Sequence, residues 1–214
     1  MKRRFFSTAL LATSAWLSAL PAKAQWAFKA GKDYVVLDRP VPTDVPTGKI
    51  ELLEFFWYSC PHCNKFEPTF APWVKEAPKD VVVRRVPVAF RDDFAPQQRL
   101  FYTLEAMNLL DSLHAKVFHA VHDERLPLNT EATILAWVEK QGVDKAKFGE
   151  IFKSFAVTAK IKKAVQLQND FRIEGVPSLG VAGRFYIDGG LAGSMERALK
   201  VAESLIAQAR SGKW

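Results

Sequence analysis

The stretch EFFWYSCPHCNKFEP, residues 54–68, contains both cysteines of the 214-residue chain, Cys60 and Cys63, separated by a Pro-His dipeptide. The run KIELLEFF, residues 49–56, is almost continuously apolar, which is typical of a buried central strand. From Cys60 onward we expect a helix, because a proline fits the first helical turn, where its missing N–H costs nothing. The cysteine pair is therefore predicted to lie between the end of a buried strand and the start of a helix.

A metal site is a poor explanation for this pair. A structural zinc ion needs four nitrogen or sulfur ligands, and the chain has no second cysteine pair. His114, His119 and His122 lie on one expected helical stretch, but nothing in the sequence places them near Cys60, so we expect surface or boundary histidines. Covalent haem attachment needs a histidine directly after the second cysteine, where the chain has Asn64.

The remaining choice is between a structural disulfide and a redox-active pair. On the chain-entropy model, closing a four-residue loop stabilises a fold by only about 2 kcal/mol, against about 4.7 kcal/mol for a 100-residue loop. At a helix start, free backbone N–H groups and the positive dipole end stabilise a thiolate. His62 adds to that effect if it is protonated or donates a hydrogen bond. We therefore expect Cys60 to be an acidic, exposed nucleophile and Cys63 a buried resolving thiol.

The first 24 residues have the pattern of a secretory signal. Basic residues 2–4 precede an apolar run over 5–20 and the small-residue sequence PAKA at 21–24, which predicts cleavage after Ala24. An uncleaved membrane anchor is the alternative, but the run is short for a span of about 20 residues. Export implies an oxidising compartment, in which a disulfide persists.

Removal of this segment changes the charge balance. The net charge falls from +7 to +3, because residues 1–24 contain four Lys or Arg and no Asp or Glu. A chain this close to neutral, with basic and acidic residues interleaved, gives no electrostatic reason to bind nucleic acid.

The rest of the chain alternates between strand and helix patterns. A short strand is expected over 34–37 and a second long strand over 81–88, so that strand, helix and strand form a βαβ unit in which Pro68 and Pro72 limit or kink the helix. Residues 91–168 have apolar side chains at helical spacing, with helix starts near Thr130 and Asp144.

The strand pattern returns after this helical segment. Residues 176–181 and 184–187 form an expected hairpin around Ala182-Gly183, and an amphipathic helix over 194–210 is expected to cover the sheet.

The CPHC motif after an apolar strand, the later Gly175-Val176-Pro177 sequence and the inserted helices resemble the DsbA family, periplasmic thiol:disulfide oxidoreductases of the thioredoxin superfamily. The resemblance spans nearly all of residues 25–210. It implies an α/β thioredoxin-like fold made of residues 25–90 and 169–214, interrupted by a helical domain at 91–168.

The resemblance also implies roles for individual residues. Pro177 corresponds to a family cis-proline that faces the active-site disulfide, and the backbone of Val176 to one that pairs with substrate; an isolated Val-Pro bond is otherwise expected to be trans. Glu54 corresponds to a buried acid that helps to move protons, the alternative being a solvent-facing strand residue. The family often pairs this acid with lysine, whereas here the register falls near Arg85, which either takes that place without releasing a proton or faces solvent.

The implied activity is the introduction of disulfides into newly exported proteins. The redox group is the Cys60–Cys63 disulfide, with Pro61 and His62 setting its properties, and no other cofactor is expected. Unfolded clients with free cysteines would contact the backbone and apolar side chains such as Phe56 and Trp57. A DsbB-like, quinone-linked membrane oxidase would reoxidise the pair, and we expect a monomer. A disulfide isomerase or reductase of the same fold and a non-enzymatic binding module remain as alternatives.

Overall fold

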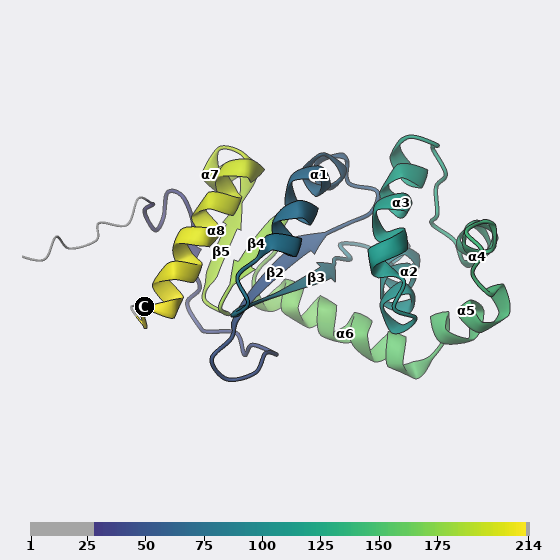
Figure 1. Ribbon diagram of the computed structural model, residues 1–214, viewed down its shortest axis with the longest axis horizontal. Coiled ribbons are helices and arrows are strands. Elements are labelled where there is room, and N and C mark those ends of the chain that lie inside the picture. Colours follow the sequence, from purple (N-terminus) through teal and green to yellow (C-terminus); the bar gives the residue numbers. More distant parts are fainter. Residues whose placement is uncertain (1–27, 213–214) are drawn as a thin grey trace, which may run out of the picture.

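A five-stranded mixed sheet lies at the centre of the computed structural model, which describes residues 28–212 (Figure 1). The strand order is β1-β5-β4-β2-β3. β2 pairs in parallel with β3 and antiparallel with β4, so the expected central strand is an interior strand. The predicted signal segment, residues 1–24, lies outside the described residues. The strands are β1 Val35–Val36, β2 Ile50–Phe56, β3 Val81–Pro87, β4 Ser178–Val181 and β5 Phe185–Asp188.

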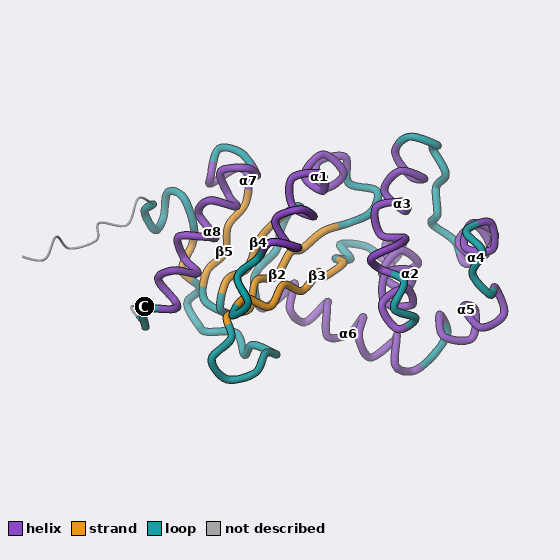
Figure 2. Tube along the Cα trace, viewed as in Figure 1, coloured by secondary structure: helices purple, strands orange, loops and turns teal. Residues whose placement is uncertain are grey.

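The helices lie between and after these strands (Figure 2). Within residues 28–212, none of them is long and apolar enough to cross a membrane. They are α1 Pro61–Glu76, the 3₁₀ turn η1 Asp92–Phe94, α2 Ala95–Ala106, α3 Leu110–His122, α4 Glu131–Lys140, α5 Lys145–Phe152, α6 Phe155–Asp170, α7 Gly189–Ala192 and α8 Met195–Arg210.

Helix α1 connects the parallel strands β2 and β3 and completes the predicted βαβ unit. Of the two expectations for its prolines, that they limit the helix or kink it, the first was wrong, because α1 continues through Pro68 and Pro72 to Glu76. The two prolines are four residues apart and both are exposed. The carbonyls that they leave without an N–H partner therefore face solvent, which can hydrate them.

Helices cover both faces of the sheet (Figure 1). On one face, Leu52 and Leu179 pack in a buried cluster with Phe66 of α1 and Leu205 of α8. On the other, Phe55 shares a cluster with side chains of α2, α3 and α6. Successive strand residues point to opposite faces of a sheet. Leu53 and Phe55 point toward α2, α3 and α6, so Glu54, which lies between them in the sequence, points toward α1.

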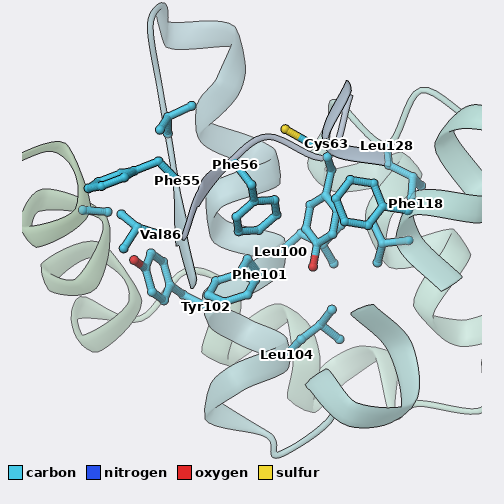
Figure 3. Close-up of a cluster of buried hydrophobic side chains, with 14 of the residues drawn as sticks. Phe55, Phe56, Cys63, Val86, Leu100, Phe101, Tyr102, Leu104, Phe118 and Leu128 are labelled. Atoms are coloured by element: carbon cyan, nitrogen blue, oxygen red, sulfur yellow. The ribbon is translucent and has the colours of Figure 1, made fainter. Parts of the chain in front are cut away.

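The helices between β3 and β4 share their core with the sheet. In Figure 3, Phe56 at the end of β2 lies beside Phe101 of α2 and Phe118 of α3, and the ring centroids are 5.3 and 6.0 Å apart. Helix α6 runs two residues past the domain boundary predicted at residue 168. The predicted helix starts are confirmed, since Thr130 and Asp144 accept hydrogen bonds from the first turns of α4 and α5.

The predicted hairpin and last helix are also present. Ala182 and Gly183 both have positive φ, at 52° and 65°, and the Arg184 N–H donates to the Val181 carbonyl at 2.9 Å, as in a type I′ turn. Ser194 caps α8 by accepting from the Arg197 N–H.

Candidate active site

Cys60 is the N-cap residue of α1, directly after the turn that follows β2. Its backbone is extended, with φ −82° and ψ 117°, and Pro61 occupies the first helical turn. The Cys60 carbonyl accepts the first helical hydrogen bond, from the Asn64 N–H at 3.1 Å. The two cysteines, which are free thiols, thus lie one turn apart at the helix start, as predicted.

Both cysteines are largely buried. Cys60 is 8% exposed and Cys63 is 1% exposed. The prediction of a buried Cys63 is confirmed, but the prediction of an exposed Cys60 was wrong, because the loop before β4 lies against it. When protonated, the Cys60 thiol donates to the Val176 carbonyl, with 3.3 Å between sulfur and oxygen.

The two thiols have opposite acidities. A hydrogen bond from the Cys63 thiol lowers the pKa of Cys60 to about 6 against the opposing effect of burial, with further contributions from the backbone N–H groups of Cys63 and His62 and from the His62 charge. Burial raises the pKa of Cys63 far above its ordinary value, and the neighbouring Cys60 adds to this. Near neutral pH the pair therefore presents one thiolate and one protonated thiol.

Three of the predicted residues meet at a groove of 490 Å³ beside the cysteines. His62, which is exposed, lines this groove together with Val176 and Pro177. The Val176–Pro177 peptide bond is cis, as the family resemblance implied. The remaining lining comes from the segment around α7 and the start of α8, together with Lys65, Phe66 and Gly175.

Glu54 lies beneath the cysteines and is paired with Arg85. The two residues are opposite each other in the β2–β3 register, and Glu54 Oε2 is 2.9 Å from Arg85 Nη1. Arg85 also binds Glu67 of α1 through both of its terminal nitrogens, at 2.5 and 3.0 Å. This geometry settles the open question, because Arg85 takes the place beside Glu54, and it excludes the solvent-facing alternative for Glu54, which is 1% exposed.

His114 belongs to the same buried cluster, which corrects the expectation of a surface or boundary position. It is 6% exposed, and its Nε2 lies 2.8 Å from Arg85 Nη1. A guanidinium can only donate, so Nε2 accepts and the neutral ring carries its proton on Nδ1. Nδ1 then donates to the Tyr58 hydroxyl at 2.8 Å.

Another histidine of α3 approaches the active-site turn. His122 Nε2 lies 2.8 Å from the Tyr58 carbonyl, two residues before Cys60. His122 is half-buried and His119 is exposed, as expected for boundary and surface positions, although nothing in the sequence indicated that His122 contacts this turn.

The pKa values of the groups in this buried cluster are shifted in different directions. Burial raises the pKa of Glu54 to about 7, although Arg85 opposes this rise. Burial likewise opposes the ionised form of Glu67, but the guanidinium of Arg85 outweighs burial and lowers the Glu67 pKa. Burial lowers the pKa of His114 to about 4. Glu54 is therefore the group in this cluster that changes protonation near neutral pH, and its charge acts on the Cys63 thiol.

Spacing along two helices could have identified the members that sequence reasoning missed. Glu67 follows Cys63 by four residues and shares its buried helical face. His114 follows Leu110 by four residues, on the apolar face of α3.

Phe56 and Trp57, the two apolar side chains expected to contact clients, differ in their exposure. Phe56 is fully buried and cannot contact a client, whereas Trp57 is half-buried and stacks on Phe94.

Comparison with known proteins gives the family. The model of the DSBA-like thioredoxin domain matches residues 85–197. The thiol:disulfide interchange protein DsbA of Bordetella parapertussis is 43% identical over 209 residues, which cover 97% of this chain and 96% of the relative.

Solved structures agree with this match. The crystal structure of Pseudomonas aeruginosa DsbA is 40% identical, with a TM-score of 0.83 over 86% of this chain and 96% of that one. The oxidoreductase DsbA from Xylella fastidiosa is 26% identical, with a TM-score of 0.79 over 86% and 98%. With its cysteine pair at the start of α1 and this similarity over nearly its full length, the chain belongs to the DsbA family of thiol:disulfide interchange proteins.

Proposed function

We propose that the protein oxidises thiol pairs of newly exported proteins, with Cys60 as the sulfur that substrates attack. The observation that carries this assignment is the opposite acidity of the two cysteines, which gives Cys60 a lowered and Cys63 a raised pKa. A dithiol whose reduced form is stabilised in this way gives up its disulfide readily, as an oxidant must.

The reaction consists of two exchanges. A substrate thiolate attacks Cys60 of the Cys60–Cys63 disulfide, a substrate–Cys60 bond forms, and Cys63 leaves and takes up a proton. The second substrate thiolate then attacks the substrate sulfur of this mixed disulfide and releases Cys60 as a thiolate. The substrate gains one disulfide and loses two electrons, which the cysteine pair receives.

Glu54 is the proposed proton source and acceptor for Cys63. Its pKa of about 7 lets it exist in either form at working pH, and its charge acts on the Cys63 thiol. Arg85 holds the Glu54 carboxyl in place and does not itself exchange a proton.

Val176 and Pro177 are the proposed substrate-binding residues. Their loop touches the Cys60 sulfur and forms one wall of the groove beside it. A client in extended conformation would place its cysteine against Cys60 and pair its backbone with that of Val176.

The cellular setting follows from the family and from the predicted signal. We propose export to the periplasm with cleavage after Ala24, action as a monomer, and reoxidation by a DsbB-like membrane oxidase. Sequencing of the exported protein should begin at Gln25, and a start at Met1 would overturn the cleavage. In cells the pair should rest as the disulfide, whereas a resting dithiol would indicate an isomerase.

Client oxidation in vitro tests the proposed activity. The oxidised protein is mixed with a reduced, unfolded two-cysteine protein, and disulfide formation is followed by thiol alkylation and mass spectrometry. The wild type should transfer one disulfide per molecule and Cys60→Ser none. Oxidation by Cys60→Ser at the wild-type rate would overturn the assignment of Cys60.

A further inference from the structure

The hydroxyl of Tyr186 lies beside Asp188, one of the residues that line the active-site groove. It donates to Asp188 Oδ2 at 2.5 Å and lies 3.3 Å from the Ser178 hydroxyl. Ser178 in turn donates to the Gly175 carbonyl at 2.7 Å, in the loop that carries Val176 and Pro177. Hydrogen bonds through Ser178 and Tyr186 thus connect the loop beside Cys60 with Asp188.

Asp188 is the charged member of this connection, and it lines the groove. Its Oδ1 accepts from the Leu191 N–H at 2.7 Å and caps α7, while its Oδ2 is turned to Tyr186. The other charged or titratable side chains that line the groove are His62, Lys65 and Glu196.

The direction of these hydrogen bonds is fixed by the groups involved. A carboxylate only accepts, so the Tyr186 proton points at Asp188. Burial and the hydrogen bond to Asp188 raise the pKa of Tyr186, which keeps it a donor at working pH. The Ser178 proton is used for the Gly175 carbonyl, so no other hydroxyl proton among these groups can replace that of Tyr186.

We infer that Tyr186 is a positioning residue that holds the Asp188 carboxylate away from the path of the substrate, and so limits the negative charge met by the incoming thiolate. This inference rests on the proposed function, in which substrate binds beside Val176. Without the hydroxyl, Asp188 Oδ2 loses its partner and is free to turn into the groove. A carboxylate there repels a substrate thiolate and acidic flanking residues, and it attracts basic ones.

Two peptides that differ only in the residue next to their cysteine, Glu or Lys, measure this effect. The readout is the ratio of their rate constants for attack on the oxidised protein, Glu peptide over Lys peptide. Tyr186→Phe should lower this ratio about fivefold, because moving the Asp188 carboxylate from about 8 to about 4 Å from the flanking residue slows the Glu peptide and speeds the Lys peptide by about 2.3-fold each in a solvated groove. Tyr102→Phe, which removes a hydroxyl from α2 in the helical segment, is the matched control and should leave the ratio unchanged.

A second pair of variants separates the charge from a general structural effect. The Asp188→Asn variant can still accept from the Leu191 N–H but carries no charge at this position. The double variant Asp188→Asn, Tyr186→Phe should therefore show the same Glu-to-Lys peptide ratio as the single variant Asp188→Asn. An unchanged ratio in Tyr186→Phe would overturn the inference, and so would a fivefold fall that persists on the Asp188→Asn background.

The same reactions test the proposed function separately, through the formation of mixed disulfides with Cys60. If the wild type forms mixed disulfides through Cys60 but the ratios do not respond to Tyr186→Phe, only the role of Tyr186 fails. If the wild type forms no mixed disulfide through Cys60 with either peptide, the proposed function fails and the inference fails with it.

Discussion

Glu54 and Arg85 are direct partners in the β2–β3 register, and their side chains form an ion pair of 2.9 Å beneath the cysteine pair. Glu54 does not have Arg85 to itself, because Arg85 also contacts Glu67 and His114. Burial consequently prevails over the attraction of Arg85 and raises the Glu54 pKa to about 7. Arg85 itself remains charged at working pH. Glu54 beside it can still exchange a proton.

Glu54→Gln should stabilise the reduced protein at alkaline pH. The folded pKa of Glu54 lies above its unfolded value, so its contribution to stability is fully present below about pH 4.5 and is lost as pH rises through about 7. At about pH 8 the variant should be more stable than the wild type by up to about 3 kcal/mol, with little difference at about pH 4.5. Urea unfolding at both values measures this, and a destabilised variant at pH 8 would contradict it.

His114→Gln should change stability in acid. The folded pKa of about 4 lies below the ordinary value of 6.5, so the stabilising contribution of neutral His114 is present above 6.5 and is lost as pH falls toward 4. Between about pH 8 and pH 5 this costs the wild type about 2 kcal/mol, which the variant should not lose. Unfolding free energies at both values provide the measurement. His119→Gln, at an exposed position of the same helix, is the control, and equal pH dependence in all three proteins would count against a neutral buried His114.

Replacing Arg85 tests the ion-pair cluster as a whole. Arg85→Met leaves Glu54 and Glu67 buried without their cation, which should destabilise the fold by about 3 kcal/mol at about pH 8. The loss should be smaller at about pH 5, where Glu54 binds a proton. Arg85→Lys keeps the charge but not the two-nitrogen contact with Glu67, and should cost about 1 kcal/mol. Equal losses for the two variants would show that the charge is unimportant.

The thiolate absorbance of the reduced protein should report the acidity of Cys60. The wild type should titrate at about pH 6. Compared with an ordinary thiol near 8.5, this stabilises the reduced form at pH 7 by about 1.4 kcal/mol, or about 30 mV of potential. Because the pKa is lowered, the effect is complete above about pH 8.5 and is lost as pH falls through 6.

The His62 side chain should supply a small part of that effect. His62→Ala removes its charge but keeps the backbone N–H groups of the helix start, which also lower the Cys60 pKa. The pKa should therefore rise by less than about one unit and the potential should fall by less than about 20 mV, measured by glutathione equilibration. Identical titrations of the two proteins would show that His62 has no influence.

Local sequence predicted the elements that local rules determine. The apolar run of β2, the proline after Cys60, the hairpin turn at Ala182-Gly183 and the caps of α4 and α5 each act within a few residues, and the structure confirms them. The expectation that prolines limit α1 was wrong. A helix can continue past a proline when the carbonyl that loses its N–H partner faces solvent, and the sequence around the proline does not show this exposure.

Partners that come from distant elements could not be predicted in the same way. Helical spacing could place His114 and Glu67 on buried faces, but their contact with Arg85 requires the β2–β3 register and the packing of α3 near α1. The burial of Cys60 also depends on a distant segment, since Val176 follows it by 116 residues. The role of Tyr186 depends on the same long-range arrangement around the groove.

The most direct test of the account asks which cysteine exchanges with a substrate sulfur. Cys63→Ala and Cys60→Ala proteins are incubated with an activated disulfide of a client peptide, and the covalent complexes are mapped by mass spectrometry. The low pKa of Cys60 and its contact with the Val176 loop predict rapid formation of a stable complex through Cys60 in Cys63→Ala, because the resolving thiol is absent. The buried, protonated Cys63 should react far more slowly in Cys60→Ala. Faster capture through Cys63 would contradict the assignment of the two sulfurs.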